Sequence, residues 1–287
     1  KTEYRWSDWE CNDFIQCGVR VQREHDGSYA LSQEKYVDEL KYINIRANRK
    51  KDKHGETDDM EKSQLRTLLG GVSWYAQQVA PQFSAEVGLL LSEVSRSTIE
   101  TLGRANKLMH QVKESKHHRL LIPKIDIHDS GLFAWCDAAG QNRVDGSSTQ
   151  GYMIGLSNMG LMKGQLELVA PICWNSSKIQ RVCRSPGASE AVAAVNAEDA
   201  LFFCRFQLAE MLGREYKIRQ VNRLVNTIPG CVITDSRNVF DKTSTEVVCT
   251  KGSERRVDLE LMALKHSQLR NGVVVRWVHS EAQLANS

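Results

Sequence analysis

The chain has 287 residues, of which 41% are hydrophobic and 25% are charged. This composition is typical of a globular protein with a sizeable core, and it excludes a disordered tail, a collagen-like chain and a small disulfide-stapled domain. Its 38 lysines and arginines against 35 aspartates and glutamates give a net charge of +3. Charge alone therefore does not indicate a nucleic-acid-binding protein.

The eight cysteines are scattered and form no C-x-x-C pair, which favours reduced thiols in an intracellular protein over zinc ligands or disulfides. No signal peptide opens the chain. The longest uncharged stretch, residues 67–85, contains three glutamines and a proline, which a bilayer-spanning helix tolerates poorly. We therefore expect neither a secreted nor a membrane protein. The start without Met and the end at Ser287 suggest a fragment of a longer chain.

Short strands and helices are predicted for the first part of the chain. Partial alternation over residues 14–21 and 29–31 predicts a hairpin whose turn lies at residues 26–28. Ser32 is expected to cap a helix that ends at Leu40. The basic segment at residues 46–53 is interpreted as a solvated loop, with a phosphate-contacting strip as the alternative.

Residues 63–115 have the apolar periodicity of three helices, divided first by Pro81. The first helix carries a stripe of Leu65, Leu68, Leu69, Val72 and Tyr75. The second carries Phe83, Val87, Leu90, Leu91 and Val94, and the third carries Leu102, Ala105, Leu108, Met109 and Val112. No dense catalytic motif lies here, so we interpret these helices as a scaffold.

The pattern changes near residue 125, where we place a boundary between residues 1–125 and 126–287. Beyond it the predicted elements are strands at 132–136, 151–156 and 171–175, a long helix at 187–211, a strand at 230–234, a helix around 259–264 and a strand at 272–279. This order predicts an α/β domain with a mixed five-stranded sheet. Trp135, Trp174 and Trp277 lie in the predicted strands, where we expect core positions.

Three acidic residues stand out by position. Asp137 and Asp235 each follow an apolar strand, and Glu190 lies in the first turns of the long helix, before a run of small residues. Ligands commonly bind at the carboxyl ends of strands in α/β sheets. Three converging carboxylates would repel one another unless a divalent cation neutralised them. Carboxylate oxygens are ligands that suit Mg²⁺. Two such ions side by side can support the hydrolysis of a phosphodiester bond. The alternative is that each Asp is only a turn residue or a helix cap.

Ordered motifs give the chain a family resemblance. Three segments of the first part resemble short family motifs. They are Cys17-Gly18-Val19-Arg20-Val21 for L-G-I-E-I, Leu31-Ser32-Gln33-Glu34-Lys35-Tyr36 for L-S-Q-x-K-Y, and Leu68-Leu69-Gly70-Gly71-Val72-Ser73-Trp74-Tyr75 for S-L-V-G-S-L-L-Y. These are motifs that follow the reverse-transcriptase palm in copia-type LTR retrotransposon Pol polyproteins. From residue 14 onward the chain thus resembles the C-terminal part of such a Pol.

The second part resembles the ribonuclease H domain of the same family. The matching segments are Cys136-Asp137-Ala138-Ala139 for S-D-A-D, Ser148-Thr149-Gln150-Gly151-Tyr152 for S-T-S-G-Y, Cys173-Trp174-Asn175-Ser176-Ser177-Lys178 for S-W-x-S-K-K, Thr234-Asp235-Ser236 for C-D-N and Gln283-Leu284-Ala285-Asn286 for Q-L-A-D. The resemblance implies a ribonuclease H-like fold after a mainly helical, thumb- or connection-like remnant of the reverse transcriptase with a small hairpin. It also implies a truncated C-terminal helix.

The resemblance assigns the family's metal-binding acids to Asp137, Glu190 and Asp235, and its fourth acid to Asn286. Asn286 is neutral and brings no charge to a dication. The residues at 186–188, Pro-Gly-Ala, also replace S-T-E of the family. The implied cofactor is Mg²⁺, with Mn²⁺ as an alternative ion.

The implied function is Mg-dependent, endonucleolytic hydrolysis of the RNA strand of RNA–DNA hybrids during reverse transcription, with the hybrid and the rest of the Pol reverse transcriptase as partners. The resemblance also implies a location in the cytoplasm, within a virus-like particle, or in the nucleus. The alternative is a decayed copy that keeps the fold and weak nucleic-acid binding but cleaves nothing. The chain lacks an aromatic residue two positions before a pair of aspartates, so no polymerase activity is expected from this chain alone.

Overall fold

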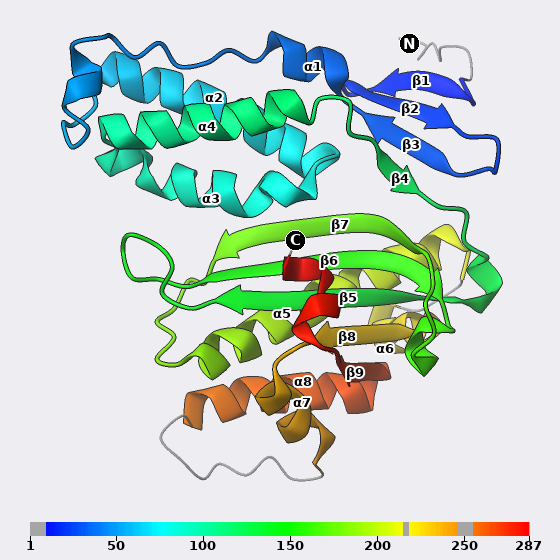
Figure 1. The fold of residues 1–287 in the computed structure, drawn as a ribbon. Helices are drawn as coiled ribbons and strands as arrows, with labels where there is room; N and C mark the ends of the chain where they lie inside the picture. Colours follow the sequence, from blue (N-terminus) through cyan, green and yellow to red (C-terminus); the bar gives the residue numbers. More distant parts are fainter. Residues whose placement is uncertain (1–9, 215–217, 246–254, 287) are drawn as a thin grey trace, which may run out of the picture.

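The structure, a computed structural model, describes residues 10–214, 218–245 and 255–286. Figure 1 shows two groups of elements, one above the other. The first combines four helices with a small antiparallel sheet, and the second is built on a larger sheet of mixed direction. This arrangement agrees with the mainly helical region and the α/β region expected from the sequence.

The first sheet has four antiparallel strands in chain order: β1 (Asp13–Gln16), β2 (Val19–Arg23), β3 (Tyr29–Ser32) and β4 (Leu120–Ile122). The single strand predicted over residues 14–21 is wrong, because the chain reverses at Cys17 and Gly18. These residues have φ of 50° and 80°, as a tight two-residue hairpin turn requires at both central positions. The predicted hairpin therefore becomes three strands, and β4 returns from far along the chain.

The first helix, α1 (Glu34–Glu39), begins later than expected. Gln33 and not Ser32 precedes it, and Gln33 makes no side-chain cap hydrogen bond. Ser32 instead lies opposite Arg20 in the ladder between β2 and β3. Its backbone thus belongs to the sheet, which explains why the capping prediction for Ser32 is wrong.

Three longer helices form the scaffold predicted for residues 63–115: α2 (Asp59–Gln78), α3 (Ser84–Glu93) and α4 (Ile99–Glu114). The stripe predicted on the first of them, Leu65, Leu68, Leu69, Val72 and Tyr75, is buried. Pro81 begins a short 3-10 turn, Pro81–Phe83, between α2 and α3. Amphipathic periodicity therefore identified most of the core of this region, but Leu91 of the second predicted stripe is exposed, so a core position is wrong for it.

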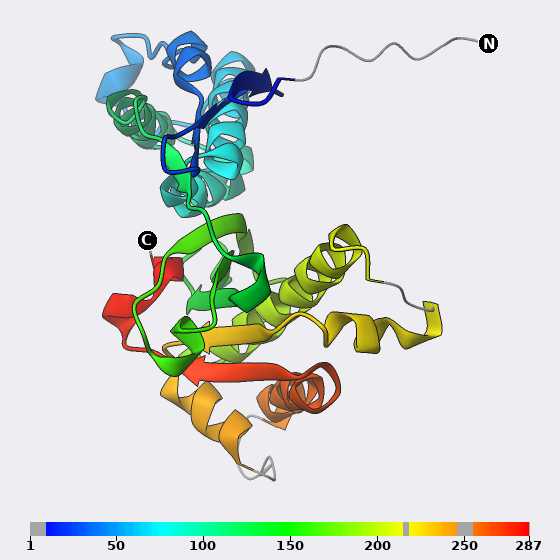
Figure 2. The same ribbon diagram turned by 90° about the vertical axis from the view of Figure 1, so that its right-hand side faces the viewer.

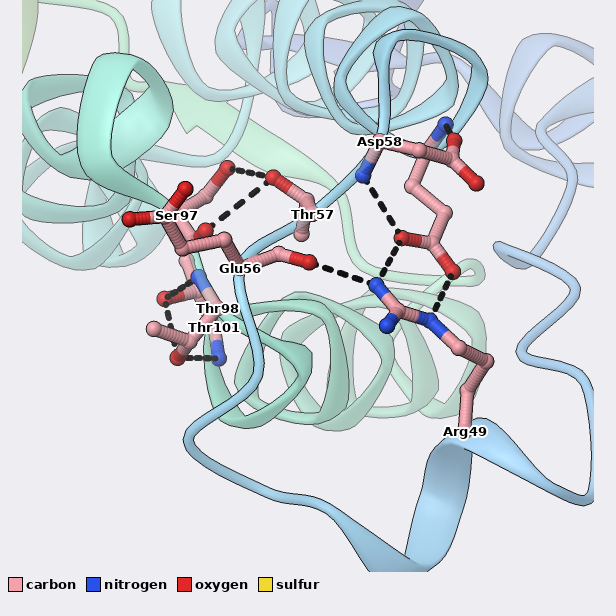
Figure 3. Close-up of polar contacts among 8 residues, drawn as sticks. Arg49, Glu56, Thr57, Asp58, Ser97, Thr98 and Thr101 are labelled. Carbon is pink, nitrogen blue, oxygen red and sulfur yellow. Dashed lines mark hydrogen bonds and ion pairs between the residues drawn. The ribbon is translucent and has the colours of Figure 1, made fainter.

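A polar cluster fixes the start of α2 (Figure 3). Asp58 and Glu61 form a reciprocal capping box, which starts the helix earlier than the predicted residue 63. The guanidinium of Arg49 donates to both carboxylate oxygens of Glu61, at 3.2 and 2.9 Å. Arg49 is thus an ion-pair partner of a buried acid, whereas Lys50 and Lys51 beside it are exposed as a solvated segment predicts.

The second sheet has five strands in the order β7-β6-β5-β8-β9. Its strands are β5 (Ser130–Ala139), β6 (Thr149–Asn158), β7 (Val169–Lys178), β8 (Gly230–Thr234) and β9 (Val273–Trp277). The first three form an antiparallel meander, while β8 and β9 run parallel to β5. The predicted mixed sheet is confirmed.

Helices cover one face of this sheet. The long α5 (Pro186–Met211) packs against β5, β6 and β8, and α8 (Arg255–Asn271) packs against α5. The close approach of α5 uses small buried residues, namely Ala188, Ala191, Ala193, Ala194 and Ala197. Two short helices, α6 (Val221–Val225) and α7 (Arg237–Ser244), were not predicted. An antiparallel meander extended by two parallel strands and covered by α5 is the ribonuclease H-like fold.

None of the helices within the described residues combines the length and apolarity needed to cross a membrane.

The two groups of elements touch along β7 and α3, as Figure 2 shows from the side. The indole nitrogen of Trp174 in β7 donates to the carbonyl of Ala76 in α2 at 2.8 Å. Arg143 donates to the carbonyl of Gly88 in α3 at 3.5 Å. The boundary near residue 125 stays a prediction; residue 125 lies in the segment between β4 and β5.

Candidate active site

Two carboxylates of the site come from neighbouring parallel strands. In the register of β5 and β8, Cys136 lies opposite Thr234, so the next residues, Asp137 and Asp235, lie side by side. Thr234 is the last residue of β8, while β5 continues past Asp137 to Ala139. Parallel pairing thus brings together two acids that are far apart in the sequence.

The third carboxylate comes from the start of α5. The hydroxyl of Ser185 accepts from the backbone N–H of Ala188 at 3.1 Å and caps the helix, and Glu190 follows within the first turns. Ligand oxygens of Asp137, Glu190 and Asp235 all lie within 4.8 Å of one another, and each residue is half-buried. The clustering expected from the sequence is therefore present in the structure.

Burial and like charge perturb the protonation of this cluster. Desolvation, followed by repulsion from Asp137 and Asp235, raises the pKa of Glu190 to about 8. Desolvation also raises the pKa of Asp137, with a smaller contribution from Asp235. Three adjacent carboxylates in a partly dehydrated site cannot all ionise without compensation. The cluster therefore needs either protons or a cation.

The donor set fits a hard divalent cation. One carboxylate oxygen of Glu190, Oε2, is buried and has no hydrogen-bond partner among the described residues, although a buried polar atom normally has one. Three carboxylates within reach of one ion supply the oxygen ligands that Mg²⁺ and Mn²⁺ favour. Asp137, Glu190 and Asp235 are the residues that would hold such an ion.

The sequence did not indicate the residues that support Asp235. The hydroxyl of Ser280 donates to Asp235 Oδ2 at 2.7 Å, and the indole of Trp277 donates to the backbone carbonyl of Asp235 at 2.9 Å. The guanidinium of Arg237 lies 4.4 Å from the centre of the Trp277 ring. These contacts join segments about 40 residues apart, so no local motif reveals them.

The three tryptophans expected in the core have different environments. Trp135 is buried as predicted, and Trp174 is half-buried at the junction with α2. Trp277 is 37% exposed, so a core position is wrong for it. The reason is that β9 is an edge strand of the sheet and Trp277 is its last residue.

Asn286, the fourth predicted site residue, lies in a 3-10 turn (η8, Leu284–Asn286) that packs against β5 and β6. Its amide nitrogen donates to the carbonyl of Ser280 at 3.2 Å. Among the described residues, its hydrogen-bonded link to the cluster runs through Ser280 to Asp235. A direct role of Asn286 at a cation stays a prediction.

A cleft opens beside Asp137 between the two groups of elements. Its lining combines α3 and the turn before it with the three meander strands and η8, and it includes Pro81, Ser84, Asp137, Gln150, Trp174 and Asn175. The lining contains amide and hydroxyl groups as well as apolar side chains. Asp137, one carboxylate of the cluster, thus lines a groove that both parts of the chain build.

Comparisons with known proteins place the fold. No protein-family model matches the chain, and no curated protein matches its sequence. Over 96% of its length the chain is similar to a foamy viral protease–reverse transcriptase solved in complex with an RNA/DNA hybrid, with 15% identity and a TM-score of 0.51.

Two smaller structures match 54% of the chain. They are ribonuclease H1 from Halobacterium salinarum, with 14% identity, 89% of that chain and a TM-score of 0.31, and the N-terminal RNase H domain of a Mycobacterium tuberculosis protein, with 16% identity, 90% of that chain and a TM-score of 0.31. The chain spans 30% of the length of the foamy viral protein. At 15% identity the likeness concerns architecture: over nearly its whole length, this chain shares the fold of part of a retroviral reverse transcriptase.

Proposed function

We propose that the chain is part of a copia-type retrotransposon Pol polyprotein and that its ribonuclease H-like region, residues 126–287, hydrolyses the RNA strand of RNA–DNA hybrids. The clustering of Asp137, Glu190 and Asp235 within 4.8 Å carries this proposal. These three positions are also the ones that the family motifs assign to metal-binding acids. The fold shared with the foamy viral enzyme supports it.

The chain's own residues would do the following. Asp137, Glu190 and Asp235 would hold Mg²⁺ or Mn²⁺, and Glu190 would release its proton to solvent on binding, since its pKa is raised to about 8 in the free protein. When bound, such ions lower the pKa of an attacking water and neutralise charge on the phosphate. The hybrid would be recognised by its shape and its 2′-hydroxyls rather than by base sequence.

The remaining parts of the proposal concern partners. The rest of the Pol reverse transcriptase would present the hybrid, since this chain covers 30% of the foamy viral protein. The cleft that Asp137 lines together with both parts of the chain would offer a surface for a nucleic-acid strand next to this carboxylate. Residues 1–125 would then act as the structural support of that surface.

Cleavage of a labelled hybrid tests the proposal. With Mg²⁺ or Mn²⁺, we expect the RNA strand of an RNA–DNA hybrid to be cut, and single-stranded RNA and duplex DNA to remain intact. Asp137→Asn should reduce cutting to background, while Asp199→Asn, an exposed acid on the same α5 helix as Glu190, should leave it unchanged. Equal cutting by wild type and Asp137→Asn would point to a contaminating nuclease and contradict the proposal.

A second candidate is a decayed element copy that retains the fold and weak nucleic-acid binding. The neutral Asn286 favours this alternative, because it removes one formal charge from a site that must neutralise dications. Asn286→Asp should then restore Mg²⁺ binding and raise hybrid cleavage; a tenfold gain corresponds to about 1.4 kcal/mol of barrier. The altered Pro186-Gly187-Ala188 segment is a weaker candidate for the defect, since α5 starts there with a normal Ser185 cap.

If wild type and Asn286→Asp both fail to bind Mg²⁺ or to cut the hybrid, the decayed-copy alternative is favoured. If wild type already cuts the hybrid and the variant cuts it no faster, the charge at position 286 has no role in the reaction. Isothermal titration with Mg²⁺ and the cleavage assay together distinguish these outcomes.

A further inference from the structure

Asp235 is the carboxylate of the cluster with the fewest constraints from regular structure. It follows the last residue of β8 and precedes α7, so no strand or helix hydrogen bonding fixes it directly. Asp137 and Glu190, in contrast, lie within β5 and α5. An unrestrained carboxylate beside two others rotates away from them, since like charges at short range repel. Something outside β8 must therefore hold Asp235 toward the cluster.

Trp277, the last residue of β9, and Ser280, in the turn that follows, make contact with Asp235. Trp277 fixes its backbone through the 2.9 Å hydrogen bond to the carbonyl oxygen. Ser280 fixes its carboxylate through the 2.7 Å hydrogen bond to Oδ2. A hydroxyl donor at one oxygen restrains rotation about the Cβ–Cγ bond, and hydrogen bonds to an ionised acceptor are stronger than neutral ones.

Ser280 is itself held in place by the turn that follows it. Gln283 is buried, and its amide nitrogen donates to the backbone carbonyl of Cys136, next to Asp137, at 2.9 Å. The backbone N–H of Gln283 and the amide of Asn286 both donate to the carbonyl of Ser280, at 3.3 and 3.2 Å. The turn thus connects the strand that carries Asp137 with the hydroxyl that contacts Asp235.

We propose that Ser280 is a positioning residue of the carboxylate cluster: its hydroxyl holds the Asp235 carboxylate in the orientation that completes a divalent-cation site with Asp137 and Glu190. The inference rests on the proposed function, because it assigns Ser280 a role at the same site. It goes beyond that function in naming a neutral residue, outside the predicted acids, on which cation affinity depends.

Binding of Mn²⁺ alone to the full chain tests the inference without any cleavage assay. The electron paramagnetic resonance signal of free Mn²⁺ gives the affinity at equilibrium. We expect Ser280→Ala to bind Mn²⁺ about tenfold more weakly than wild type, as loss of a hydrogen bond to a metal ligand commonly does. Ser280→Thr keeps the hydroxyl and should restore affinity close to that of wild type. Ser92→Ala, which removes an exposed hydroxyl on α3, is the matched control and should leave the affinity for Mn²⁺ unchanged.

The outcomes separate the inference from the proposed function. If wild type binds Mn²⁺ and Ser280→Ala binds it equally well, the positioning role is overturned while the cation site stands. If Ser280→Thr binds Mn²⁺ as weakly as Ser280→Ala, the loss of affinity reflects a disturbed turn, and the positioning role is again overturned. If wild type binds no Mn²⁺, the proposed function fails, and the inference fails with it.

Discussion

At the scale of single residues, the site is defined by the conflict between burial and charge at Glu190. Its carboxylate is half-buried, has one oxygen without a partner among the described residues and lies beside two other acids. The raised pKa, about 8, means that the metal-free protein holds a proton there at neutral pH. Such perturbed groups are typical of functional sites, because binding a cation resolves the conflict.

The first prediction follows from this pKa. Between the ordinary value of 4.5 and about 8, the folded protein binds more protons at Glu190 than the unfolded chain. The stability of the metal-free protein should therefore fall as pH rises through this window. Glu190→Gln mimics the protonated state and should stabilise the metal-free protein at pH 8 by about 2–4 kcal/mol, but hardly at pH 4.

Thermal unfolding in EDTA at the two pH values measures this effect. Asp199→Asn on the same helix is the control and should show no such pH-dependent gain. A lower unfolding temperature for Glu190→Gln at pH 8 would mean that the ionised carboxylate is stabilised in the folded protein, contrary to the expectation. The same variant should also lose Mn²⁺ binding, because a cation site loses one of its three charges.

At the scale of elements, helix starts and strand pairings are fixed by contacts that extend beyond the element itself. α2 begins at Asp59 because Asp58 and Glu61 cap it and because Arg49, from a separate turn, neutralises Glu61. The side chain of Glu61 is 7% exposed and that of Arg49 is 28% exposed. The carboxylate of Glu61 is therefore shielded from water while Arg49 stays partly exposed, so the pair differs from an ordinary surface ion pair.

The second prediction concerns this pair. Arg49→Ala should lower the free energy of unfolding by about 1–3 kcal/mol, because it leaves a buried carboxylate without its cation. Lys50→Ala removes a neighbouring exposed cation and should have little effect. Urea unfolding followed by circular dichroism compares the two variants. An equal effect of both would show that Arg49 acts only through surface charge.

At the scale of the whole molecule, the packing of α3 and β4 against β7 and a hydrogen bond from Trp174 join the two groups of elements. Trp174 reaches from β7 to the carbonyl of Ala76, near the end of α2. The last carbonyls of a helix have no partner within the helix. The indole of the ribonuclease H-like region thus satisfies a carbonyl of the helical region, beside the cleft that borders Asp137.

The third prediction tests this connection. Trp174→Phe keeps the ring but removes the donor, and it should lower the free energy of unfolding by about 1–2 kcal/mol because the Ala76 carbonyl loses its partner. Trp74→Phe on α2, where Trp74 is 39% exposed, is the matched control. Amide hydrogen exchange should show faster exchange at the end of α2 in Trp174→Phe alone. Unchanged protection there would contradict a capping role for the indole.

Local patterns determined most of the elements and the order in which they occur. Apolar periodicity identified α2, α3 and α4, the long helix α5 was predicted at nearly its observed place, and short apolar runs identified all five strands of the second sheet. These predictions succeed because amphipathic spacing depends only on neighbours along the chain. Asp137, Glu190 and Asp235 stood out by their places at two strand ends and in the first turns of a helix, and the family resemblance assigned them to metal-binding acids; both depend on sequence alone.

The tertiary structure decided what those residues experience. The desolvation of Glu190 requires α5 to pack on the sheet, and the neighbouring positions of Asp137 and Asp235 require the parallel register of β5 with β8. Ser280 reaches Asp235 across 45 residues, and Trp277 is exposed because it is the last residue of β9, at the sheet edge. A sequence pattern carries periodicity and spacing, whereas burial, strand order and long-range hydrogen bonds exist only once the chain has folded.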